Sequence, residues 1–408
     1  MAAGPSVVVG VGAGIAAYKV CELVRRFTES GHDVTVVPTR AALSFVGAAT
    51  WEALSGHPVA TEVFTNGADV PHVRIGRHAD LVVVAPATAD LLARAANGLA
   101  DDLLTSTLLT ARCPTLYAPA MHTEMWEHPA TAHNVATLRS RGALVVEPAV
   151  GRLTGADTGK GRLPEAGELF DLARLLLERG RIAPDLTGRH VVVSAGGTHE
   201  PLDPVRFLGN RSSGRMGYAL ASTAIARGAT VTVVAANVTL PDPAGAELLR
   251  VETTAQLRDR MLTEAAGADA VVMAAAPADY RPVDVRDTKM KKADDGSAPV
   301  VELTQNPDVL AELVHRRTGA APFIVGFAAE TGDADGDVVT HGHAKLARKG
   351  CDLLVVNDVS AGRVFGRADS EALLLGADGS TRSVPLGSKV VLAHVLWDEI
   401  SARLLHHA

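Results

Sequence analysis

Apolar runs rich in β-branched residues alternate along the chain with stretches whose apolar positions recur at helical spacing. The N-terminal half contains the runs SVVVGVG, DVTVVPT, LVVVAPA, PTLYAPA and ALVVEPA. Stretches such as 16–30 and 89–96 between them fit helices. Strands that are apolar on both faces are typical of a parallel sheet covered by helices. The pattern therefore predicts an α/β fold for this half.

The alternation pauses at ERGRIAPDLTGRH (178–190), where Gly and Pro among charges indicate a linker. It then restarts with the runs HVVVSAGG, TVTVVAA, DAVVMAAA, FIVGFAA and DLLVVND. Near the end, EALLLGADGSTRSVPL predicts a hairpin that turns at Asp378-Gly379, and 388–405 has helical spacing. We therefore expect two Rossmann-like α/β domains with mainly parallel sheets, covering residues 1–180 and 187–408.

Composition narrows the class of protein. A length of 408 residues favours two domains, and a net charge of −7 argues against a nucleic-acid partner. The three cysteines, Cys21, Cys113 and Cys351, are far apart and odd in number, which argues against a disulfide framework or a zinc site. No run is long and apolar enough to span a membrane, and no positive segment precedes the first apolar run, as a signal peptide requires. We expect a cytoplasmic protein.

Motifs in the N-terminal half lie where strands end. GVGAG (10–14) joins a strand to a helix, a position suited to phosphate binding. By itself such a turn leaves a dinucleotide, a mononucleotide or no ligand open. PATADL (86–91) and PAMHTEMW (119–126) also follow strands, and His72 precedes one. The glycine-rich segment 151–161 is expected to be neither helix nor strand, and to close over a site as a lid.

In this order, over about residues 7–162, the motifs resemble the flavin-containing cysteine decarboxylases, specifically their phosphopantothenoylcysteine branch. The resemblance implies a flavodoxin-like domain that binds FMN. The implied FMN contacts are Gly10, Gly12, Gly14, Ile15, Thr39, Thr88 and Ser106.

Decarboxylating a cysteine amide would leave a carbanion with nothing to stabilise it, and the family uses FMN to oxidise the thiol first and to return the hydride afterwards. The resemblance implies that His72 steers the thiol proton. His122 stands where the family has asparagine, and we expect it to hold the substrate carboxylate. Gly155 stands where the family often has an acidic cysteine, which leaves Thr154, Asp157 or water open as the proton donor.

The C-terminal half has its own ordered motifs. SAGGTHEP (194–201) and GNRSSGRMG (209–217) offer glycines and hydrogen-bond donors that suit an anion. AAAPADY (274–280) follows a strand, and KMKK (289–292) is a basic cluster in an acidic chain. NPD and VGFAAET follow, and Lys345 and Lys349 would share one face of a helix.

From about Thr187 onward these motifs resemble bacterial phosphopantothenate–cysteine ligases. The resemblance implies that Lys289 stabilises charge while CTP activates a carboxylate, and that Asn210 orients the acyl intermediate. Mg²⁺ is implied with CTP, but its ligands are not identified. The implied CTP contacts are Ala274, Ala275, Asp279, Lys289, Asp308, Val309, Leu310, Ala311, Phe327, Lys345 and Lys349.

The two implied reactions are consecutive steps of coenzyme A biosynthesis, because the ligase product is the decarboxylase substrate. The small-molecule partners would be 4′-phosphopantothenate, L-cysteine and CTP. The resemblance also implies homo-oligomers, with flavin domains in trimers, the flavin at subunit contacts, and ligase domains in dimers.

Three other interpretations stay open. The changes at His122 and Gly155 allow an N-terminal half that is catalytically weak. Decarboxylase-like proteins can also inhibit phosphatases, although those carry acidic tails that this chain lacks. A nicotinamide dehydrogenase is conceivable from residues 10–14, but Thr39-Arg40 stands where its acidic residue is expected.

Overall fold

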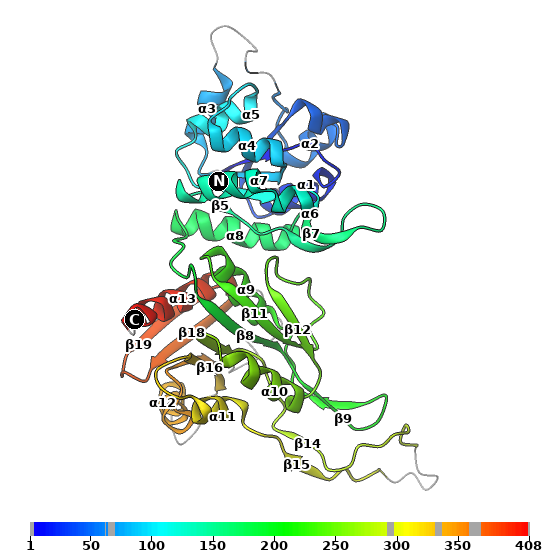
Figure 1. Ribbon diagram of the computed structural model, residues 1–408, viewed down its shortest axis with the longest axis vertical. Coiled ribbons are helices and arrows are strands. Elements are labelled where there is room, and N and C mark those ends of the chain that lie inside the picture. Colours follow the sequence, from blue (N-terminus) through cyan, green and yellow to red (C-terminus); the bar gives the residue numbers. More distant parts are fainter. Residues whose placement is uncertain are drawn as a thin grey trace. The chain divides into compact units, whose positions relative to one another are not determined.

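The computed structural model describes residues 4–61, 63, 70–291, 298–330, 337–358 and 369–406. The chain folds into two compact units (Figure 1). Unit 1 comprises Met1–Pro184 with Pro243–Gly245, and unit 2 comprises Asp185–Asp242 with Ala246–Ala408. In the part of the chain so described, no helix is long and apolar enough to cross a membrane.

Unit 1 contains a five-stranded parallel sheet in the order β2-β1-β3-β4-β5. This is the flavodoxin-like strand order, in which the chain reverses direction across the sheet between β1 and β3. The predicted α/β fold with a flavodoxin-like domain is confirmed. Its elements are β1 (Ser6–Val11), α1 (Ala17–Glu29), β2 (Asp33–Pro38), η1 (Arg40–Ser44), α2 (Ala48–Ser55), α3 (Pro71–His78), β3 (Leu81–Ala87), α4 (Ala89–Asn97), α5 (Leu103–Thr110), β4 (Thr115–Pro119), α6 (Thr123–Glu127), α7 (Pro129–Ser140), β5 (Leu144–Val145), β6 (Ala149–Arg152), β7 (Thr158–Arg162) and α8 (Ala166–Arg179).

Helices cover both faces of this sheet. Val8 and Val82 pack on one face in a buried cluster with side chains of α4, α5 and α7. Successive side chains of a strand point to opposite faces, and α1 and α8 contact the strands from the other side. Burial on both faces explains why β1 and β3 read as continuous apolar runs.

The segment 151–161, predicted to be neither helix nor strand, takes part in an antiparallel hairpin of β6 and β7, so that part of the expectation was wrong. That the segment closes over a site as a lid stays a prediction. The pairing places Gly151 opposite Gly159. Strand pairing uses backbone N–H and C=O groups, which glycine carries like any other residue. Because glycines have no side chains, the sequence shows no alternation of apolar and polar residues that would predict these strands.

Unit 2 contains an eight-stranded sheet in the order β12-β11-β8-β13-β16-β17-β18-β19, parallel up to β17 and antiparallel beyond it. Its first six strands follow the Rossmann order, which reverses between β8 and β13. Its elements are β8 (His190–Gly196), β9 (His199–Pro201), β10 (Phe207–Gly209), α9 (Arg215–Ala226), β11 (Thr230–Ala236), β12 (Glu247–Val251), α10 (Thr254–Ala265), β13 (Ala270–Met273), β14 (Tyr280–Pro282), β15 (Leu303–Gln305), α11 (Val309–Arg316), β16 (Phe323–Glu330), α12 (Val338–Lys349), β17 (Leu353–Asp358), β18 (Asp369–Gly376), β19 (Thr381–Ser388) and α13 (Lys389–His406).

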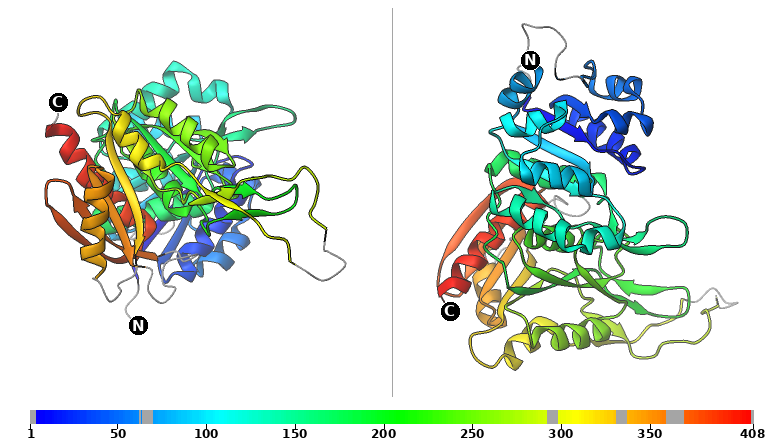
Figure 2. Two further views of the ribbon diagram at one scale, coloured as in Figure 1. Left: turned by 90° about the horizontal axis from the view of Figure 1, so that it is seen from below. Right: turned by 45° about the horizontal axis from the view of Figure 1, so that its top comes forward.

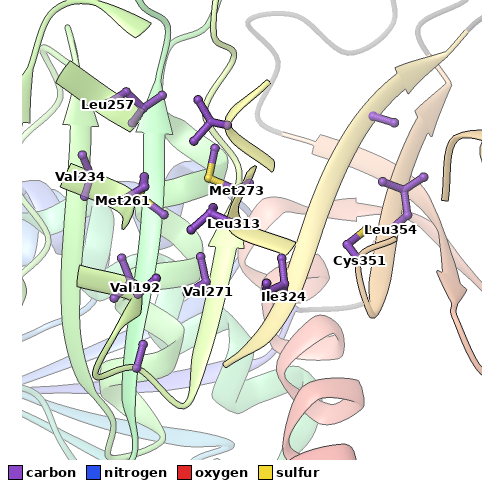
Figure 3. Close-up of a cluster of buried hydrophobic side chains, with 14 of the residues drawn as sticks. Val192, Val234, Leu257, Met261, Val271, Met273, Leu313, Ile324, Cys351 and Leu354 are labelled. Atoms are coloured by element: carbon purple, nitrogen blue, oxygen red, sulfur yellow. The ribbon is translucent and has the colours of Figure 1, made fainter. Parts of the chain in front are cut away.

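The main core of unit 2 lies between this sheet and α10, α11 and α12 (Figure 3). Val192, Val271 and Ile324 extend from neighbouring strands toward Met261 of α10 and Leu313 of α11. On the opposite side, α9 contacts β8 and β11 and packs against α13. Helices therefore cover both faces of the sheet, and the candidate nucleotide residues lie near the ends of its strands.

Two antiparallel pairs extend from the sheet of unit 2. They are β9 with β10 and β14 with β15, and they contact each other through β9 and β14 (Figure 2). The predicted late hairpin is confirmed as β18 and β19, with Gly379 in a left-handed conformation at its turn. The predicted last helix is confirmed as α13.

Candidate active sites

Unit 1 has a cavity of about 530 Å³ at the carboxyl ends of its strands. Its walls come from the turn after β1, Pro86 at the end of β3, the segment after β4 and the β6–β7 hairpin. The reversal point between β1 and β3 is where open α/β sheets bind ligands. The volume lies within the range of roughly 300–1,000 Å³ that is usual for small-molecule sites.

The glycines of the turn after β1 have different roles. A Cβ atom at Gly10 would lie 2.4 Å from a methyl carbon of Leu104, and one at Gly12 would lie 2.3 Å from the Pro86 carbonyl oxygen. These two glycines are required by packing inside the protein. Gly14 has no neighbour within 4 Å of its Cβ position, and it lines the cavity with Ile15. That any of them contacts FMN stays a prediction.

The three predicted hydroxyl contacts lie near the same edge but do not line this cavity. Thr39 and Thr88 cap η1 and α4, where their Oγ1 atoms accept hydrogen bonds from the backbone N–H groups of Ala42 and Leu91, both at 3.3 Å. Ser106 is nearly buried on α5. The two threonines remain able to donate their hydroxyl protons to a ligand.

His122 faces the cavity together with the β6–β7 hairpin. It precedes α6 in an extended conformation, and its ring makes no capping hydrogen bond. The His122 Nε2 atom lies 3.2 Å from Oγ1 of Thr154 in the hairpin. Both side chains line the cavity, so the hairpin forms part of its wall.

The hairpin is held against the segment after β4 by close backbone contact. The Met121 N–H donates to the Gly161 carbonyl at 3.0 Å, and a Cβ at Gly161 would lie only 2.1 Å from the Met121 oxygen. Glu147, just before β6, binds Lys160 at 2.6 Å and Arg139 at 2.7 Å. Burial would raise the pKa of Glu147, but these two partners outweigh it and hold the pKa below its ordinary value.

His72 is not among the residues that line this cavity, and it lies in the first turn of α3, the helix that precedes β3. Its backbone carbonyl accepts a hydrogen bond from Thr110 of α5 at 2.7 Å. Its Nδ1 atom is buried and has no hydrogen-bond partner among the described residues. A buried polar atom without a partner is uncommon and marks His72 for a functional explanation.

In unit 2, the loops after β8 and β13 meet at the reversal point of the sheet. The Ala276 N–H donates to the Gly196 carbonyl at 2.8 Å, and the Ala275 N–H donates to Ser194 Oγ at 3.0 Å. Asn210 joins them, because its Nδ2 donates to the Pro277 carbonyl at 2.8 Å. The structure therefore brings Asn210, Ala274, Ala275 and Asp279 to one edge of the sheet.

A buried chain of hydrogen bonds fixes this loop, and sequence reasoning missed it. The Ala278 N–H donates to Thr198 Oγ1 at 2.8 Å, and Thr198 lies 2.9 Å from the hydroxyl of Thr254. Thr254 donates to the Glu200 carboxylate at 2.8 Å, while Asn306 donates to the Ala278 carbonyl at 2.9 Å. Thr198, Glu200, Ala278 and Asn306 belonged to recognised motifs, but Thr254 did not, and the spacing of these residues in sequence gives no signal that they meet.

A third part of the same edge is the start of α11. Asp308 caps this helix, accepts a hydrogen bond from the Ala311 N–H at 3.1 Å, and forms an ion pair with Lys349. Burial would raise the pKa of Asp308, but Lys349 and the Ala311 N–H outweigh it and lower the pKa. Lys345 lies one turn before Lys349, so the predicted helical face is confirmed.

The other predicted contacts are distributed around this helix start. Val309 and Leu310 occupy the first turn of α11, and Leu310 packs against Gly326. Phe327 follows on β16 and is partly buried. Thr331, at the end of the predicted VGFAAET motif, lies outside the described residues.

Lys289 is exposed on the segment between β14 and β15. Its neighbour Met290 is bound on both sides, since its N–H donates to Asp203 at 3.1 Å and its carbonyl accepts from Arg206 at 2.9 Å. The Arg206 guanidinium holds the pKa of the Asp203 carboxyl well below its usual range. No described contact joins Lys289 to Asp279, and Lys292 of the same basic cluster lies outside the described residues.

A metal site made of protein ligands is absent from the part of the chain that the structure describes, where no three His, Cys, Asp or Glu side chains are grouped suitably. All three cysteines are free thiols. Burial raises the pKa of the Cys351 thiol to about 11, so this thiol is protonated and packs as a core residue.

Residues 1–177 match the family described as Flavoprotein, and residues 186–404 match the DNA/pantothenate metabolism flavoprotein C-terminal domain. The chain is 60% identical over 400 residues to the Coenzyme A biosynthesis bifunctional protein CoaBC of Mycobacterium tuberculosis (strain ATCC 25618 / H37Rv), covering 97% of this chain and 96% of that protein. The chain belongs to the family of bifunctional coenzyme A biosynthesis proteins.

The likeness to this family extends to distant bacteria. The family protein of Bacillus subtilis (strain 168) is 40% identical over 401 residues, covering 97% of each chain. A crystal structure of the C-terminal domain of a bifunctional coenzyme A biosynthesis protein is 29% identical, covering 55% of this chain and 100% of that one, with a TM-score of 0.46. The identity to the family proteins over nearly the whole chain confirms the resemblance seen in the motifs.

Proposed function

We propose that unit 2 joins 4′-phosphopantothenate to L-cysteine with CTP, and that unit 1 decarboxylates the resulting 4′-phosphopantothenoylcysteine to 4′-phosphopantetheine. Family membership supports decarboxylase and ligase activities in one chain. The observation that carries the proposal is that each motif set lies at the reversal point of its own parallel sheet. We assign the decarboxylase to residues 1–180 and the ligase to residues 187–408.

The residues around the cavity of unit 1 fit a flavin mononucleotide. The open backbone at Gly14–Ala16 lies just before the N-terminus of α1, which suits a phosphate, and Arg152 and Arg162 add positive charge. Met121 and Leu153 offer apolar surface for a ring. The flavin, when bound, supplies the reversible oxidation of the substrate thiol that allows carbon dioxide to leave.

The histidines of unit 1 act on the substrate. His72 steers the thiol proton, a role supported by its buried and unpartnered Nδ1 atom. His122 meets the substrate at the cavity wall. Because His72 does not line that cavity, we propose that the flavin units assemble as trimers in which a neighbouring copy completes the site. The exposed side chains of Leu99 and Leu109 support such an assembly.

In unit 2, the carboxylate of 4′-phosphopantothenate attacks the α-phosphate of CTP, giving an acyl-cytidylate and pyrophosphate, and the cysteine amine then displaces CMP. The carboxylate and the phosphate of 4′-phosphopantothenate must approach the triphosphate of CTP, and all three are anionic, so cations are required. Lys345 and Lys349 beside the α11 N-terminus supply fixed positive potential, and Lys289 adds charge during activation. Asn210 orients the acyl intermediate, which its position beside Pro277 supports.

Magnesium would be carried mainly by the triphosphate. This ion keeps several waters and commonly binds one or two carboxylates together with substrate phosphates. The predicted CTP contacts include two carboxylates, Asp279 and Asp308, and because Asp308 forms an ion pair with Lys349, Asp279 is the candidate ligand. Such a site does not need a grouped set of protein ligands.

We further propose that the ligase units pair as dimers and that the reactions take place in the cytoplasm. Large apolar side chains are exposed on or next to the two pairs of strands that extend from unit 2, among them Phe207, Tyr280 and Val283. Exposed apolar surface of this kind is typical of contacts between protein chains. The free thiols fit a reducing compartment.

Two variants test the division of labour. Lys289→Ala should abolish formation of the acyl-cytidylate while flavin stays bound, and His72→Asn should stop carbon dioxide release without slowing ligation. Each half-reaction is measured separately, ligation by CMP release and decarboxylation with 4′-phosphopantothenoylcysteine supplied directly. Normal ligation by the first variant, or normal carbon dioxide release by the second, would remove the corresponding assignment.

A further inference from the structure

The proposed decarboxylation needs a proton at one carbon atom. The net reaction replaces the carbon–carboxylate bond of the cysteine unit by a carbon–hydrogen bond. The substrate thiol is first oxidised and later reduced again, so the net reaction contains no change of oxidation state at sulfur. The electron pair left behind by carbon dioxide must therefore be protonated before the hydride is returned. The need for a proton donor in unit 1 thus rests on that proposed function.

The side chains that line the cavity leave few candidates. Arg152 and Arg162 do not give up protons, because a guanidinium stays charged in proteins. Lys19 lines the cavity too, but its ammonium group forms an ion pair with Glu165 at 3.0 Å. Tyr18 lines the cavity as well, but a phenol is a weaker acid than an imidazolium. An imidazole ordinarily titrates near neutrality, which suits a group that must donate and recover a proton in each cycle.

The imidazole on this wall is His122, and its surroundings hold it in place. Its ring does not cap α6, so both nitrogen atoms are available for other contacts. Its Nε2 lies 3.2 Å from the Thr154 hydroxyl. Thr154 lies in the turn of the hairpin, where its carbonyl accepts a hydrogen bond from the Asp157 N–H at 3.0 Å. The hairpin also contacts the residue before His122, since the Met121 N–H donates to the Gly161 carbonyl at 3.0 Å. The hairpin therefore presents Thr154 to His122 as a consequence of how it packs.

The hairpin itself offers no stronger acid at the neighbouring position. Gly155 has no side chain, and its φ of +61° disfavours other residues there. A group that contacts the substrate carboxylate also lies close to the carbon that loses it. A side chain at this position can therefore first bind the carboxylate and then protonate the carbon that has lost it.

We propose that His122 donates this proton and that Thr154 is a positioning residue that orients its ring. The imidazolium gives up an N–H proton, and the electron pair left by the departing carboxylate takes it up as the new carbon–hydrogen bond. His122, which is exposed at the cavity mouth, then recovers a proton from solvent.

The test supplies 4′-phosphopantothenoylcysteine to the full-length flavin-loaded protein and measures carbon dioxide separately from the mass of the organic product. In His122→Asn, carbon dioxide is still released, but the product is an enethiol two hydrogens lighter than the thiol, and the two electrons stay on the flavin. Carbon dioxide release is then limited to one equivalent per bound flavin unless dissolved oxygen reoxidises the flavin. Formation of the saturated thiol falls by roughly 10²–10⁴-fold, the usual contribution of a general acid. The Kd for 4′-phosphopantetheine, which has no carboxylate, stays unchanged in calorimetry.

Three further variants separate donation from structure. Thr154→Val lowers the rate of thiol formation, but by less than His122→Asn does. Thr154→Ser keeps the hydroxyl and therefore forms the thiol at close to the wild-type rate. Thr154→Cys in the His122→Asn background restores thiol formation, because it puts an acidic thiol on the same wall. His128→Asn is the matched control, since His128 caps α7 outside the cavity and asparagine also caps helices.

The outcomes are distinct. Saturated thiol formed at the wild-type rate by His122→Asn overturns the inference. Loss of carbon dioxide release in that variant also overturns it, because His122 would then act before the carboxylate leaves. Absence of carbon dioxide release from the wild-type protein would instead refute the proposed decarboxylase function itself.

Discussion

The buried hydrogen-bond chain behind the ligase edge gives a prediction whose size follows from the structure. Thr198 is fully buried, so Thr198→Val changes the shape of the side chain little and removes the hydroxyl. The Ala278 N–H then loses its acceptor, whereas Thr254 keeps its bond to Glu200. Leaving one buried donor without a partner costs about 1–3 kcal/mol. We expect unit 2 to lose that much of its free energy of unfolding.

The assay is thermal unfolding followed by circular dichroism, with flavin fluorescence as a separate probe of unit 1. For a domain of 150–250 residues, each kcal/mol lowers Tm by roughly 2–4 °C. The KM for CTP should rise by roughly fivefold to tenfold, which corresponds to about 1–1.4 kcal/mol, because Ala278 adjoins Asp279. The unfolding of unit 1 should not change.

Thr223→Val is the matched control. Thr223 is equally buried, but its hydroxyl donates at 2.7 Å to the Ala219 carbonyl within α9, an oxygen that the helix already satisfies. Losing such a bond should change stability by less than about 1 kcal/mol. If Thr198→Val destabilises unit 2 no more than Thr223→Val does, the hydrogen-bond chain does not stabilise the ligase edge and the reasoning is refuted.

Two other predictions concern contacts at the two sites. Gly161→Ala should slow decarboxylation at least about tenfold and leave the ligation rate unchanged, because the new methyl group meets the Met121 oxygen and displaces the hairpin. Gly167→Ala is its control: the space at Gly167 is open, so both rates should stay unchanged. Asp308→Asn should remove the ion pair with Lys349. Because the folded pKa of Asp308 lies below its unfolded value near 4, the stability difference between wild type and variant should be present above about pH 4 and shrink as the pH falls through the folded pKa. A difference that does not shrink as the pH is lowered below about 4 would contradict this.

The strands and the motifs at their ends could be predicted because they depend on local patterns. The run at 81–87 is a buried strand over its full length, and the motif after it lies at the sheet edge, as parallel strands require. The hairpin of β6 and β7 could not be predicted, because it pairs backbone groups of glycine-rich segments and leaves no side-chain pattern.

Roles that depend on distant neighbours were also beyond the sequence. Gly10 and Gly12 suggested close approach of a phosphate, yet they make room for Leu104 and for the Pro86 carbonyl. A glycine in a sequence does not reveal whether a ligand or another segment of the chain needs the space. The bond between Thr198 and Thr254 likewise joins residues 56 positions apart, which no local pattern records.

Mass spectrometry of a single reaction tests whether this one chain performs both steps. The purified protein is mixed with 4′-phosphopantothenate, L-cysteine, CTP and Mg²⁺, and all products are identified. We expect 4′-phosphopantetheine together with CMP and pyrophosphate, because these products form only if both units work in sequence. A reaction that stops at 4′-phosphopantothenoylcysteine would contradict the role of unit 1, and absence of CMP would contradict the role of unit 2.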